Sequence, residues 1–316
     1  MAGTVLLTGA AGAVGAALLD VLRAASWRSR CLEHRRTVRG ADEIVRGDLA
    51  DPPSLARAVD GVDAVLHLAA LTHARRPRPY AEVNVGGTIA LVEAFRRSQA
   101  RRLVLVSTRA VSPRGGAYSV SKLRAEKVVR SLGPRQAIVR LPEVYGAGGA
   151  EGVDRLVSLA AASRTLALPG RGGHEVSPVL VDDVVGPLVA ALDADAAAGR
   201  TYTLAGPAMT TRSFAEACVA AFGSGSRIVH VPISALAVAS TLARVAPLPF
   251  YPDQLRRLLA PKPGPSPEAH ADLGFWPRGV EEGLAVTRER LGRRKEARSA
   301  SARPRIPQAL GRRPHG

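Results

Sequence analysis

A phenol and an ammonium group lie four residues apart in the segment Tyr118-Ser119-Val120-Ser121-Lys122. On a helix, residues at positions i and i+4 are neighbours on one face. A phenol with a pKa of about 10 is a poor base near neutral pH, and an adjacent positive charge stabilises its phenolate form. The spacing therefore predicts a proton-transfer pair, with Tyr118 as the acid or base and Lys122 supplying the positive charge.

A third polar side chain, Thr108, follows the apolar run Leu103–Ser107, which we expect to be a strand. A hydroxyl at the end of that strand can hydrogen-bond a substrate carbonyl or alcohol oxygen beside Tyr118. The Tyr-x-x-x-Lys pattern also occurs as an exposed pair on ordinary helices. The elements that precede it in the chain therefore decide its meaning.

The turn T-G-A-A-G-A-V-G follows an expected strand, Thr4–Thr8, and opens an expected helix, Val14–Ala25. A glycine-rich motif in this context indicates dinucleotide binding. The glycines permit positive φ and let the backbone approach a pyrophosphate, which the amide groups at the helix N-terminus would hold. We expect four residues of the turn to bind the cofactor: Gly9, Gly12, Val14 and Gly15.

Glu33 ends the second expected strand and lies 18 residues after Gly15. An acid about 20 residues beyond the glycine motif accepts hydrogen bonds from the adenosine ribose, which favours NAD. Arg35 and Arg36 follow directly and can instead hold the 2′-phosphate of NADP. We expect NAD as the cofactor, with NADP as the alternative.

Asp48 and Leu49 come directly after the third expected strand, at a place suited to the adenine ring. The carboxylate of Asp48 is available to the adenine amino group. A turn or helix N-terminal role explains Asp48 equally well.

Short β-branched or leucine-rich runs alternate with longer amphipathic segments between Thr4 and Arg140, as in repeated βαβ units. The expected strands are Thr4–Thr8, Ser29–Glu33, Glu43–Arg46, Ala64–Leu68, Leu103–Ser107 and Gln136–Arg140. The expected helices are Val14–Ala25, Ser54–Val59, Tyr80–Ser98 and Tyr118–Ser131. The fold class is therefore α/β, with a doubly wound parallel (Rossmann) sheet that collects ligands at the carboxyl ends of its strands.

Residues 1–170 are assigned to a dinucleotide-binding Rossmann domain, to which a strand at Thr201–Leu204 and a helix at Arg212–Phe222 can return. Residues 171–291 contain short strands, helices and proline-rich turns, and we assign most of them to a smaller C-terminal substrate-binding part. Residues 292–316 are basic, with a net charge of +7, and too poor in apolar residues to order themselves. We expect this tail to be disordered.

The net charge of +17 raises the question of a nucleic-acid partner. However, only four of the 44 Lys and Arg residues are lysines, so the excess follows an arginine bias that codon usage can explain. The aromatic content of 4% is too low for a base-stacking surface. We expect a small-molecule substrate and no specific nucleic acid.

Cys31 and Cys218 lie far apart and form no disulfide or zinc pattern, which favours a reducing cytoplasm. No cluster of His, Cys and acidic residues has metal-ligand spacing, so we expect no metal. The apolar stretch Ile233–Ala243 is shorter than the roughly 20 residues that cross a bilayer. We therefore expect a cytoplasmic protein with no membrane span.

The order of glycine-rich turn, strand-end acid, strand-end Thr and Tyr-x-x-x-Lys helix resembles the short-chain dehydrogenase/reductase superfamily. Five further segments are similar to those of its extended branch, the NAD-dependent epimerase/dehydratase-like family: His67-Leu68-Ala69-Ala70, Asn84–Thr88, Arg140–Gly146, Val181-Asp182-Asp183 and Asp272–Phe275. The resemblance runs from about Gly3 to Leu291 and implies that Thr108, Tyr118 and Lys122 are the catalytic residues. It also implies that Lys122 binds the nicotinamide ribose, and we expect Ala69 to contact the cofactor.

Other polar residues in these segments have structural explanations. We expect His67 to be a packed or hydrogen-bonded core histidine, and Asn84 to be a structural bridge between strand ends. Asp182 and Asp183 are expected to begin a helix, where carboxylates favour the dipole. Proteins that this chain resembles commonly form homodimers through the helices that correspond to Tyr80–Ser98 and Tyr118–Ser131.

Three departures from the family pattern bear on the reaction. Related dehydratases follow the catalytic Thr with an acid pair, whereas Thr108 is followed by Arg109 and Ala110. Related sugar-nucleotide epimerases place an Asn and an Arg where this chain has Glu143 and Val176. Because a diphosphate is normally held by Arg or by helix N-termini, these changes disfavour a sugar nucleotide.

We therefore expect an NAD(P)-dependent oxidoreductase that reduces a ketone, or oxidises a secondary alcohol, of a neutral or hydrophobic substrate, in secondary metabolism for example. The segment Val231–Leu259 is either an apolar lid over that substrate or ordinary helix packing. The alternatives are a sugar-nucleotide epimerase with tightly bound NAD and a noncatalytic NAD(P)-binding regulatory or assembly protein.

Overall fold

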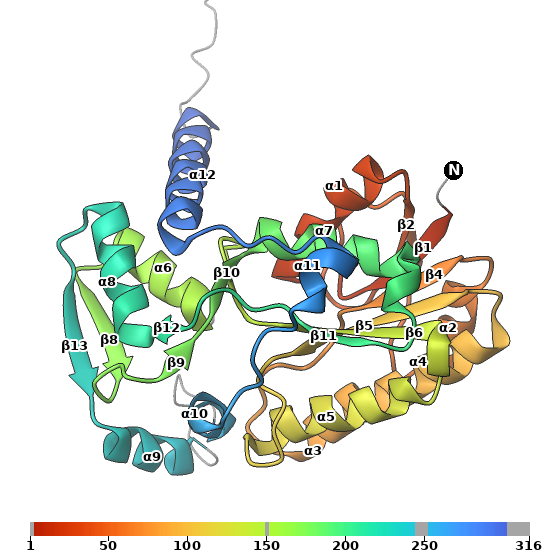
Figure 1. The fold of residues 1–316 in the computed structure, drawn as a ribbon, viewed down its shortest axis with the longest axis horizontal. Coiled ribbons are helices and arrows are strands. Elements are labelled where there is room, and N and C mark those ends of the chain that lie inside the picture. Colours follow the sequence, from red (N-terminus) through yellow and green to blue (C-terminus); the bar gives the residue numbers. More distant parts are fainter. Residues whose placement is uncertain (1–2, 149–151, 244–251, 302–316) are drawn as a thin grey trace, which may run out of the picture.

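A seven-stranded parallel sheet forms the centre of the protein (Figure 1). The computed structural model describes residues 3–148, 152–243 and 252–301. The strand order is β11-β6-β5-β4-β1-β2-β3. The strands are β1 (Thr4–Thr8), β2 (Arg28–Glu33), β3 (Glu43–Arg46), β4 (Ala64–His67), β5 (Arg102–Thr108), β6 (Gln136–Leu141) and β11 (Thr201–Thr203).

Every pairing in this sheet is parallel, so the carboxyl ends of the strands lie at one edge. The chain runs outward from β1 through β2 to β3, then returns to β4 on the other side of β1. The strand order thus reverses between β1 and β4, and ligands bind at such a switch point in doubly wound sheets. The turn after β1 and the ends of β4 and β5 meet there.

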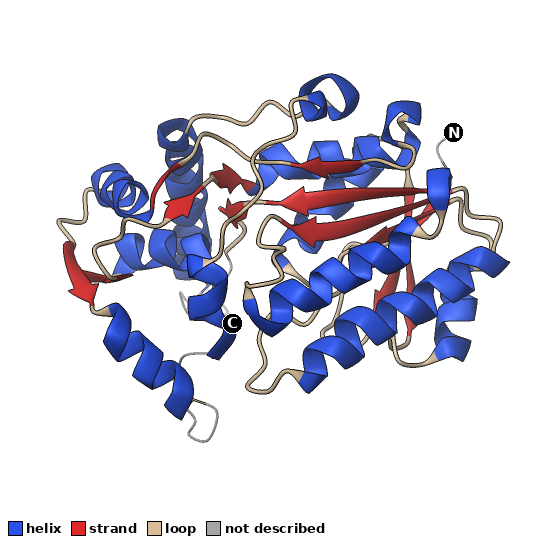
Figure 2. Ribbon diagram, turned by 60° about the horizontal axis from the view of Figure 1, so that its bottom comes forward, coloured by secondary structure: helices blue, strands red, loops and turns tan. Residues whose placement is uncertain are grey.

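Two layers of helices cover the faces of the sheet, because strands buried on both sides alternate their side chains between two cores. Val5 and Leu7 of β1 pack with one cluster, and Leu6, between them, packs with the other. The first face is covered by α1 (Ala13–Ala24), α7 (Val181–Asp193) and α11 (Glu268–Leu273) (Figures 1 and 2). The second is covered by α2 (Pro52–Val59), α4 (Gly87–Arg97) and α5 (Gly116–Arg130).

A smaller group of elements with its own core, which includes Val157, Leu166 and Phe214, lies beyond the carboxyl ends of the sheet strands. Its helices are α6 (Gly152–Ala162), α8 (Thr211–Phe222), α9 (Ile233–Leu242), α10 (Pro252–Leu259) and α12 (Val280–Ser301). Its strands form three two-stranded sheets: β7 (Glu143–Tyr145) with β10 (Pro178–Leu180), β9 (Glu175–Val176) with β12 (Met209–Thr210), and β8 (Thr165–Pro169) with β13 (Arg227–Val231).

The predicted α/β fold with a doubly wound parallel sheet is confirmed, and the predicted return of a strand near 201–204 is confirmed by the pairing of β11 with β6. The predicted return of the helix at 212–222 is wrong. Helix α8 packs mainly against α6 and α12, because its apolar face, with Phe214 and Cys218, belongs to the smaller core.

Two further predictions need correction. The helix expected at Tyr80–Ser98 is divided: α3 (Arg78–Tyr80) and a π-helical turn, η1 (Ala81–Gly86), precede α4. Residues 292–301, expected to be disordered, continue α12, since Arg, Lys, Glu and Ala are good helix formers. The rest of that predicted tail, 302–316, lies outside the described residues.

In the described part of the chain, none of the helices combines the length and the apolar character that a bilayer span requires.

Candidate active site

The glycine-rich turn between β1 and α1 has a geometry that only glycine allows. Gly9 has φ of +79°, and a Cβ there would lie 2.7 Å from the backbone nitrogen of Ala69. A Cβ on Gly15 would lie 2.8 Å from Cα of Ala10. Gly12 is the N-cap of α1, and no side chain caps this end of the helix. The backbone N–H groups of the first helical turn, at Val14 and its neighbours, can therefore donate hydrogen bonds to a ligand. This cradle fits the pyrophosphate of a dinucleotide.

Glu33 is the last residue of β2, the strand end at which the sequence predicts an acid for the adenosine ribose. Its Oε2 accepts a hydrogen bond from the Val38 nitrogen at 2.8 Å, and Oε1 lies 3.7 Å from Nε of Arg46. Arg35 and Arg36 are exposed just beyond the strand. The acid predicted to favour NAD and the two cations predicted to favour NADP thus lie at the end of β2 and just beyond it.

Asp48 and Leu49 have different environments. Asp48 accepts a hydrogen bond from the Ala50 nitrogen at 3.1 Å and pairs with Nε2 of His34 at 3.0 Å, as a turn acid does. Leu49 is buried in the core beneath α2 and α4. A Cβ added to Gly87 would lie 2.8 Å from the Cβ of Leu49. Gly87 therefore lets α4 approach this strand end closely.

A chain of buried hydrogen bonds connects the glycine-rich turn to α4. The Ala69 nitrogen donates to Oγ1 of Thr8 at 3.2 Å, and Thr8 contacts Nδ1 of His67 at 2.7 Å. Nε2 of His67 lies 3.2 Å from Oγ1 of Thr88, which donates to the Asn84 carbonyl at 2.6 Å. Burial and the charge of Lys122 lower the pKa of His67 to about 3. His67 is thus a neutral, hydrogen-bonded core histidine, as predicted.

Asn84 lies in the π-helical turn η1 and joins the loop after β4 to the Tyr/Lys helix. Its side chain accepts from the Leu71 nitrogen at 2.7 Å and donates to the Leu71 carbonyl at 3.0 Å and to Oγ of Ser121 at 2.9 Å. Ser121 in turn donates to the Tyr118 carbonyl at 2.7 Å. The predicted structural bridge is confirmed, but it runs from a strand end to α5 and not between two strand ends.

Lys122 is held at the end of β5. Its Nζ donates to the Val106 carbonyl at 2.9 Å, and its residue is only 3% exposed. Burial lowers the pKa of Lys122 to about 8, although the nearby Glu126 carboxylate opposes that change. Glu126 is itself bound by Oγ of Ser107 and by Arg140. The ammonium group is therefore bound to the backbone of β5 at Val106, two residues before Thr108.

Thr108 is the last residue of β5 and is partly buried. Its Oγ1 accepts a hydrogen bond from the Ala110 nitrogen at 3.1 Å. Tyr118 lies one helical turn before Lys122 on α5, and its ring packs edge-on against Tyr80 with 6.0 Å between the centroids. Thr108 and the Lys122 ammonium thus lie at the end of β5, and Tyr118 precedes Lys122 by one turn of α5. The shared catalytic role of the three groups stays a prediction.

Helix α10 covers Tyr118, a contact that the sequence did not reveal. Oδ2 of Asp253 accepts from the Tyr118 nitrogen at 3.2 Å, and the guanidinium carbon of Arg257 lies 4.7 Å from the centre of the Tyr118 ring. Arg257 also contacts Nε2 of His73 at 3.3 Å. The segment Val231–Leu259 was expected to be either an apolar lid or ordinary helix packing. Its helix α10 packs on α5 and contacts Tyr118 through charged side chains.

Four charged side chains, Arg109, Glu143, Glu175 and Lys262, form what we call the charged cluster. Arg109 donates to Oγ of Ser177 at 2.8 Å and to Oε1 of Glu175 at 3.1 Å. Glu143 accepts from Nζ of Lys262 at 2.7 Å and from the Ser177 nitrogen at 3.1 Å. The family pattern singles out Arg109 and Glu143, whereas no sequence signal connects Lys262, more than a hundred residues downstream, to either of them.

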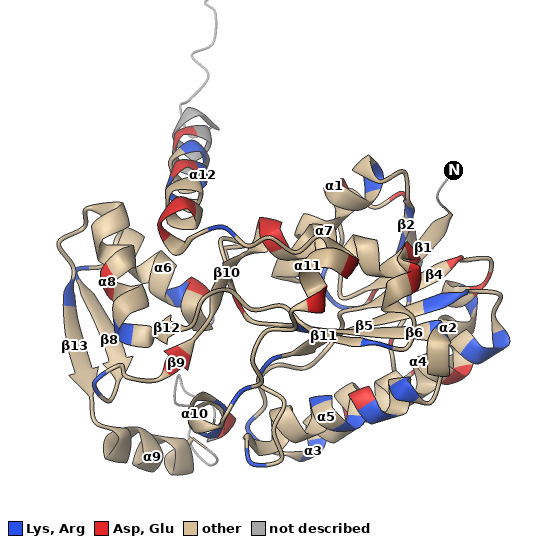
Figure 3. Ribbon diagram, in the orientation of Figure 1, with Lys and Arg blue, Asp and Glu red and all other residues tan. Residues whose placement is uncertain are grey.

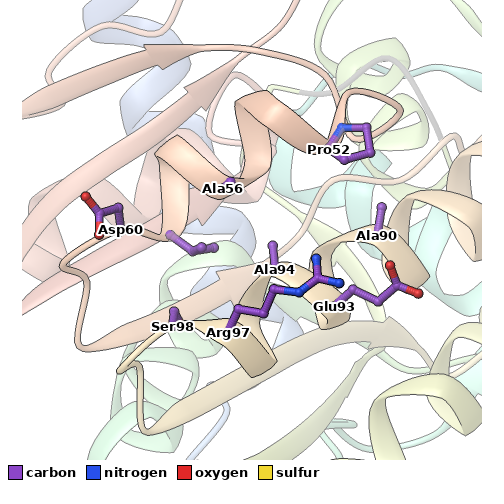
Figure 4. Close-up of a pocket in the computed structure, with 9 residues that line it drawn as sticks. Pro52, Ala56, Asp60, Ala90, Glu93, Ala94, Arg97 and Ser98 are labelled. Carbon is purple, nitrogen blue, oxygen red and sulfur yellow. The ribbon is translucent and has the colours of Figure 1, made fainter.

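A separate cavity of about 160 Å³ lies between α2 and α4 (Figure 4). Pro52, Asp60, Glu93 and Arg97 are among its lining residues. None of the lining residues belongs to the glycine-rich turn or to α5, so this cavity is distinct from the site described above. Among the described residues, no group of three or more His, Cys, Asp and Glu side chains is arranged to hold a metal.

The family model described as "NAD dependent epimerase/dehydratase family" matches residues 5–205. The chain belongs to this family. This family is NAD-dependent, which confirms the predicted NAD cofactor. Its relatives include a ceramide reductase from Caulobacter vibrioides, 36% identical over 193 residues that make up 60% of each protein. A 2-alkyl-3-oxoalkanoate reductase from Stenotrophomonas maltophilia is 29% identical over 89% of this chain and 97% of the relative.

Solved structures show the same fold at low identity. MoeE5 in complex with UDP-glucose and NAD has a TM-score of 0.76 at 23% identity, over 93% of this chain and 100% of MoeE5. A UDP-glucose 4-epimerase from Thermotoga maritima has a TM-score of 0.75 at 19% identity, over 92% of this chain and 99% of the epimerase.

Proposed function

We propose that this enzyme reduces the ketone of a neutral or hydrophobic substrate with NADH, or oxidises the corresponding secondary alcohol with NAD. The observation that carries this proposal is the contact between Lys122 Nζ and the Val106 carbonyl at 2.9 Å. This contact fixes the Tyr/Lys helix against the strand that ends in Thr108. A phenol, an ammonium and a hydroxyl are then available to one reacting oxygen.

Each side chain has one role in ketone reduction. Bound NADH supplies the hydride that the carbonyl carbon accepts. Tyr118 donates a proton to the carbonyl oxygen, and the Lys122 ammonium stabilises the phenolate that results. Thr108 donates a hydrogen bond to the same oxygen, which orients the carbonyl. Reduction of one ketone thus consumes one NADH and one proton.

Dehydration would need a different residue after Thr108. Elimination of water requires a group that removes a proton from carbon and another that protonates the departing hydroxyl. Arg109 occupies the next position, and its guanidinium is already bound to Ser177 and Glu175. This arrangement supports hydride transfer without elimination.

Two observations favour a reductase over an epimerase. Val176, at the position where related epimerases were expected to have Arg, is buried in the smaller core, so it offers no cation to a diphosphate. The two relatives described above are named as reductases of ceramide and of 2-alkyl-3-oxoalkanoates.

Helix α9 supports an apolar substrate. None of its ten residues is charged and none is buried, and Val238 and Leu242 are 60% and 51% exposed (Figure 3). A helix that is apolar on all sides is normally covered by other apolar groups. Because α9 packs on α10, and α10 covers Tyr118, we place an apolar portion of the substrate along this pair of helices.

The test is to incubate purified protein with NADH and a panel of hydrophobic ketones and sugar nucleotides while recording absorbance of the reduced nicotinamide. We expect one NADH to be consumed for each ketone reduced. Isomerisation of a sugar nucleotide without net NADH consumption would overturn the proposal and establish the epimerase.

The proposal includes a homodimer formed through η1, α4 and α5. Val83 on η1 and Ile89 on α4 are 38% and 42% exposed, and a partner chain packed on these elements would bury them. Light scattering should give twice the mass of one chain, and a monomer at micromolar concentration would contradict the dimer.

A further inference from the structure

The charged cluster lies beside the residues assigned to catalysis. Arg109 follows Thr108 directly, and its nitrogen donates to the Leu141 carbonyl at 2.8 Å, two residues before Glu143. Lys262 comes from the segment after α10, the helix that covers Tyr118. The cluster therefore joins the end of the sheet to the smaller part, where a substrate must lie to reach Tyr118.

Its charges balance. Arg109 and Lys262 are cations, and Glu143 and Glu175 are carboxylates. The side chains of Arg109 and Lys262 are 3% and 7% exposed, whereas that of Glu175 is 61% exposed and screened by water. Glu143, at 21%, is thus the one well-shielded anion between the two buried cations.

Glu143 is ionised in this environment. Burial by itself raises the pKa of a carboxyl group, but the charge and hydrogen bond of Lys262 outweigh it. The Ser177 amide and the Arg109 guanidinium act in the same direction, so the pKa of Glu143 is lowered. The carboxylate therefore neutralises the cations throughout the neutral pH range.

One buried nitrogen atom of the cluster has no hydrogen-bond partner. Nε of Arg109 is buried and has no hydrogen-bond acceptor, and Oε2 of Glu143 lies 3.9 Å from it, beyond hydrogen-bond distance. A buried donor without an acceptor is destabilising, and anionic oxygens are the strongest acceptors for a guanidinium. Two buried cations with an unsatisfied donor have the composition of an anion site, and Glu143 supplies the anion.

We propose that Glu143 is a specificity-determining residue: its carboxylate occupies the place of a substrate diphosphate beside Arg109 and Lys262 and so excludes sugar nucleotides. This inference rests on the proposed reductase function and explains how the same site rejects the substrates of related epimerases. A diphosphate that entered would meet a carboxylate of like charge and would have to separate it from Lys262.

The prediction is that Glu143→Gln creates a diphosphate site. The amide keeps the shape and an acceptor oxygen, but leaves the two buried cations with only the exposed Glu175 carboxylate. We would titrate UDP by calorimetry into wild-type and Glu143→Gln protein, each saturated with NADH so that UDP cannot occupy the dinucleotide site. The variant should bind UDP at least about tenfold more tightly than the wild type, which is about 1.4 kcal/mol.

Two matched variants locate the effect. Glu175→Gln removes a carboxylate from the same cluster at its exposed rim and should leave UDP binding close to that of the wild type. Adding Lys262→Met to Glu143→Gln should abolish the gained binding. If Glu143→Gln does not fold, Glu143→Asn, the amide expected in related epimerases, is used in its place.

Equal UDP affinity of wild-type and folded Glu143 amide variants would overturn the inference, as would gained binding that survives Lys262→Met. Ketone reduction by the wild type is measured separately. Absence of that reduction, with gained UDP binding in the variant, would overturn the proposed function and leave the role of Glu143 standing.

Discussion

The guanidinium carbon of Arg257 lies 4.7 Å from the centre of the Tyr118 ring. The same side chain contacts His73 and the Thr72 carbonyl, in the loop after β4. Arg257 therefore links α10 to the proposed catalytic helix and to the loop after β4. A cation over an aromatic face is attracted by the ring and also stabilises negative charge on its oxygen.

Replacement of Arg257 by Met should therefore affect chemistry as well as packing. In the direction of alcohol oxidation, we expect kcat to fall and the pH of half-maximal kcat to rise by about one unit, since a positive charge near the phenolate is lost. Arg257→Lys should retain the wild-type pH profile. An unchanged profile in Arg257→Met would show that the residue only packs α10 in place.

Tyr118→Phe removes the proton donor and keeps the ring. Loss of a general acid typically lowers the rate by about 10² to 10⁴. We expect kcat to fall by at least about a hundredfold while the Kd for NADH, from fluorescence titration, changes by less than about twofold. Near-normal turnover would remove Tyr118 from the mechanism.

Burial of Lys122 should make the stability of the fold depend on pH. Its pKa in the folded chain is about 8, against an ordinary value of 10.5, so folding disfavours the protonated amine. The resulting destabilisation is present in full below pH 8 and disappears as the pH rises to about 10.5. A lowering of this size corresponds to about 3 kcal/mol.

Lys122→Met removes that titration. Between pH 7 and pH 10, the wild type should gain about 2 kcal/mol of unfolding free energy relative to the variant. Urea denaturation at the two pH values measures this difference. Lys127→Met, an exposed lysine on the same helix, is the control and should give a difference that does not change with pH. A pH-independent difference for Lys122→Met would contradict the burial of its charge.

Glu33 should set the preference for NADH over NADPH. Glu33→Ala removes the carboxylate that would accept the ribose hydroxyls and leaves Arg35 and Arg36 available to a 2′-phosphate. We expect the ratio of kcat/KM for NADH to that for NADPH to fall by about tenfold or more. Adding Arg36→Ala to Glu33→Ala should then lower kcat/KM for NADPH. An unchanged ratio in Glu33→Ala would exclude Glu33 from cofactor selection.

The sequence predicted the parts of the site that depend on local order along the chain. Gly9 and Gly15 follow a strand and open a helix, and Thr108 ends another strand. Parallel pairing through β4 therefore places these residues at the same edge of the sheet. The i, i+4 spacing of Tyr118 and Lys122 likewise survives any packing of the helix that carries it.

The contacts of α10 and the charged cluster could not be predicted in the same way. Three side chains that contact the site, those of Asp253, Arg257 and Lys262, lie more than 130 residues beyond Tyr118 in the chain. The sequence of a short charged helix such as α10 indicates a surface element. The prediction that α8 packs on the main sheet is wrong for a related reason. The apolar spacing of Phe214 and Cys218 predicts a buried face but not the core in which it is buried.

Deuterium transfer tests the central claim most directly. Wild-type enzyme would be incubated with NADH carrying deuterium at the transferable C4 position and with a ketone that it consumes, and the product analysed by mass spectrometry. We predict an alcohol that carries one deuterium for each NADH oxidised, and no such product from Tyr118→Phe. A sugar nucleotide that changes configuration without net oxidation of NADH, with no deuterated alcohol from any ketone, would contradict a reductase.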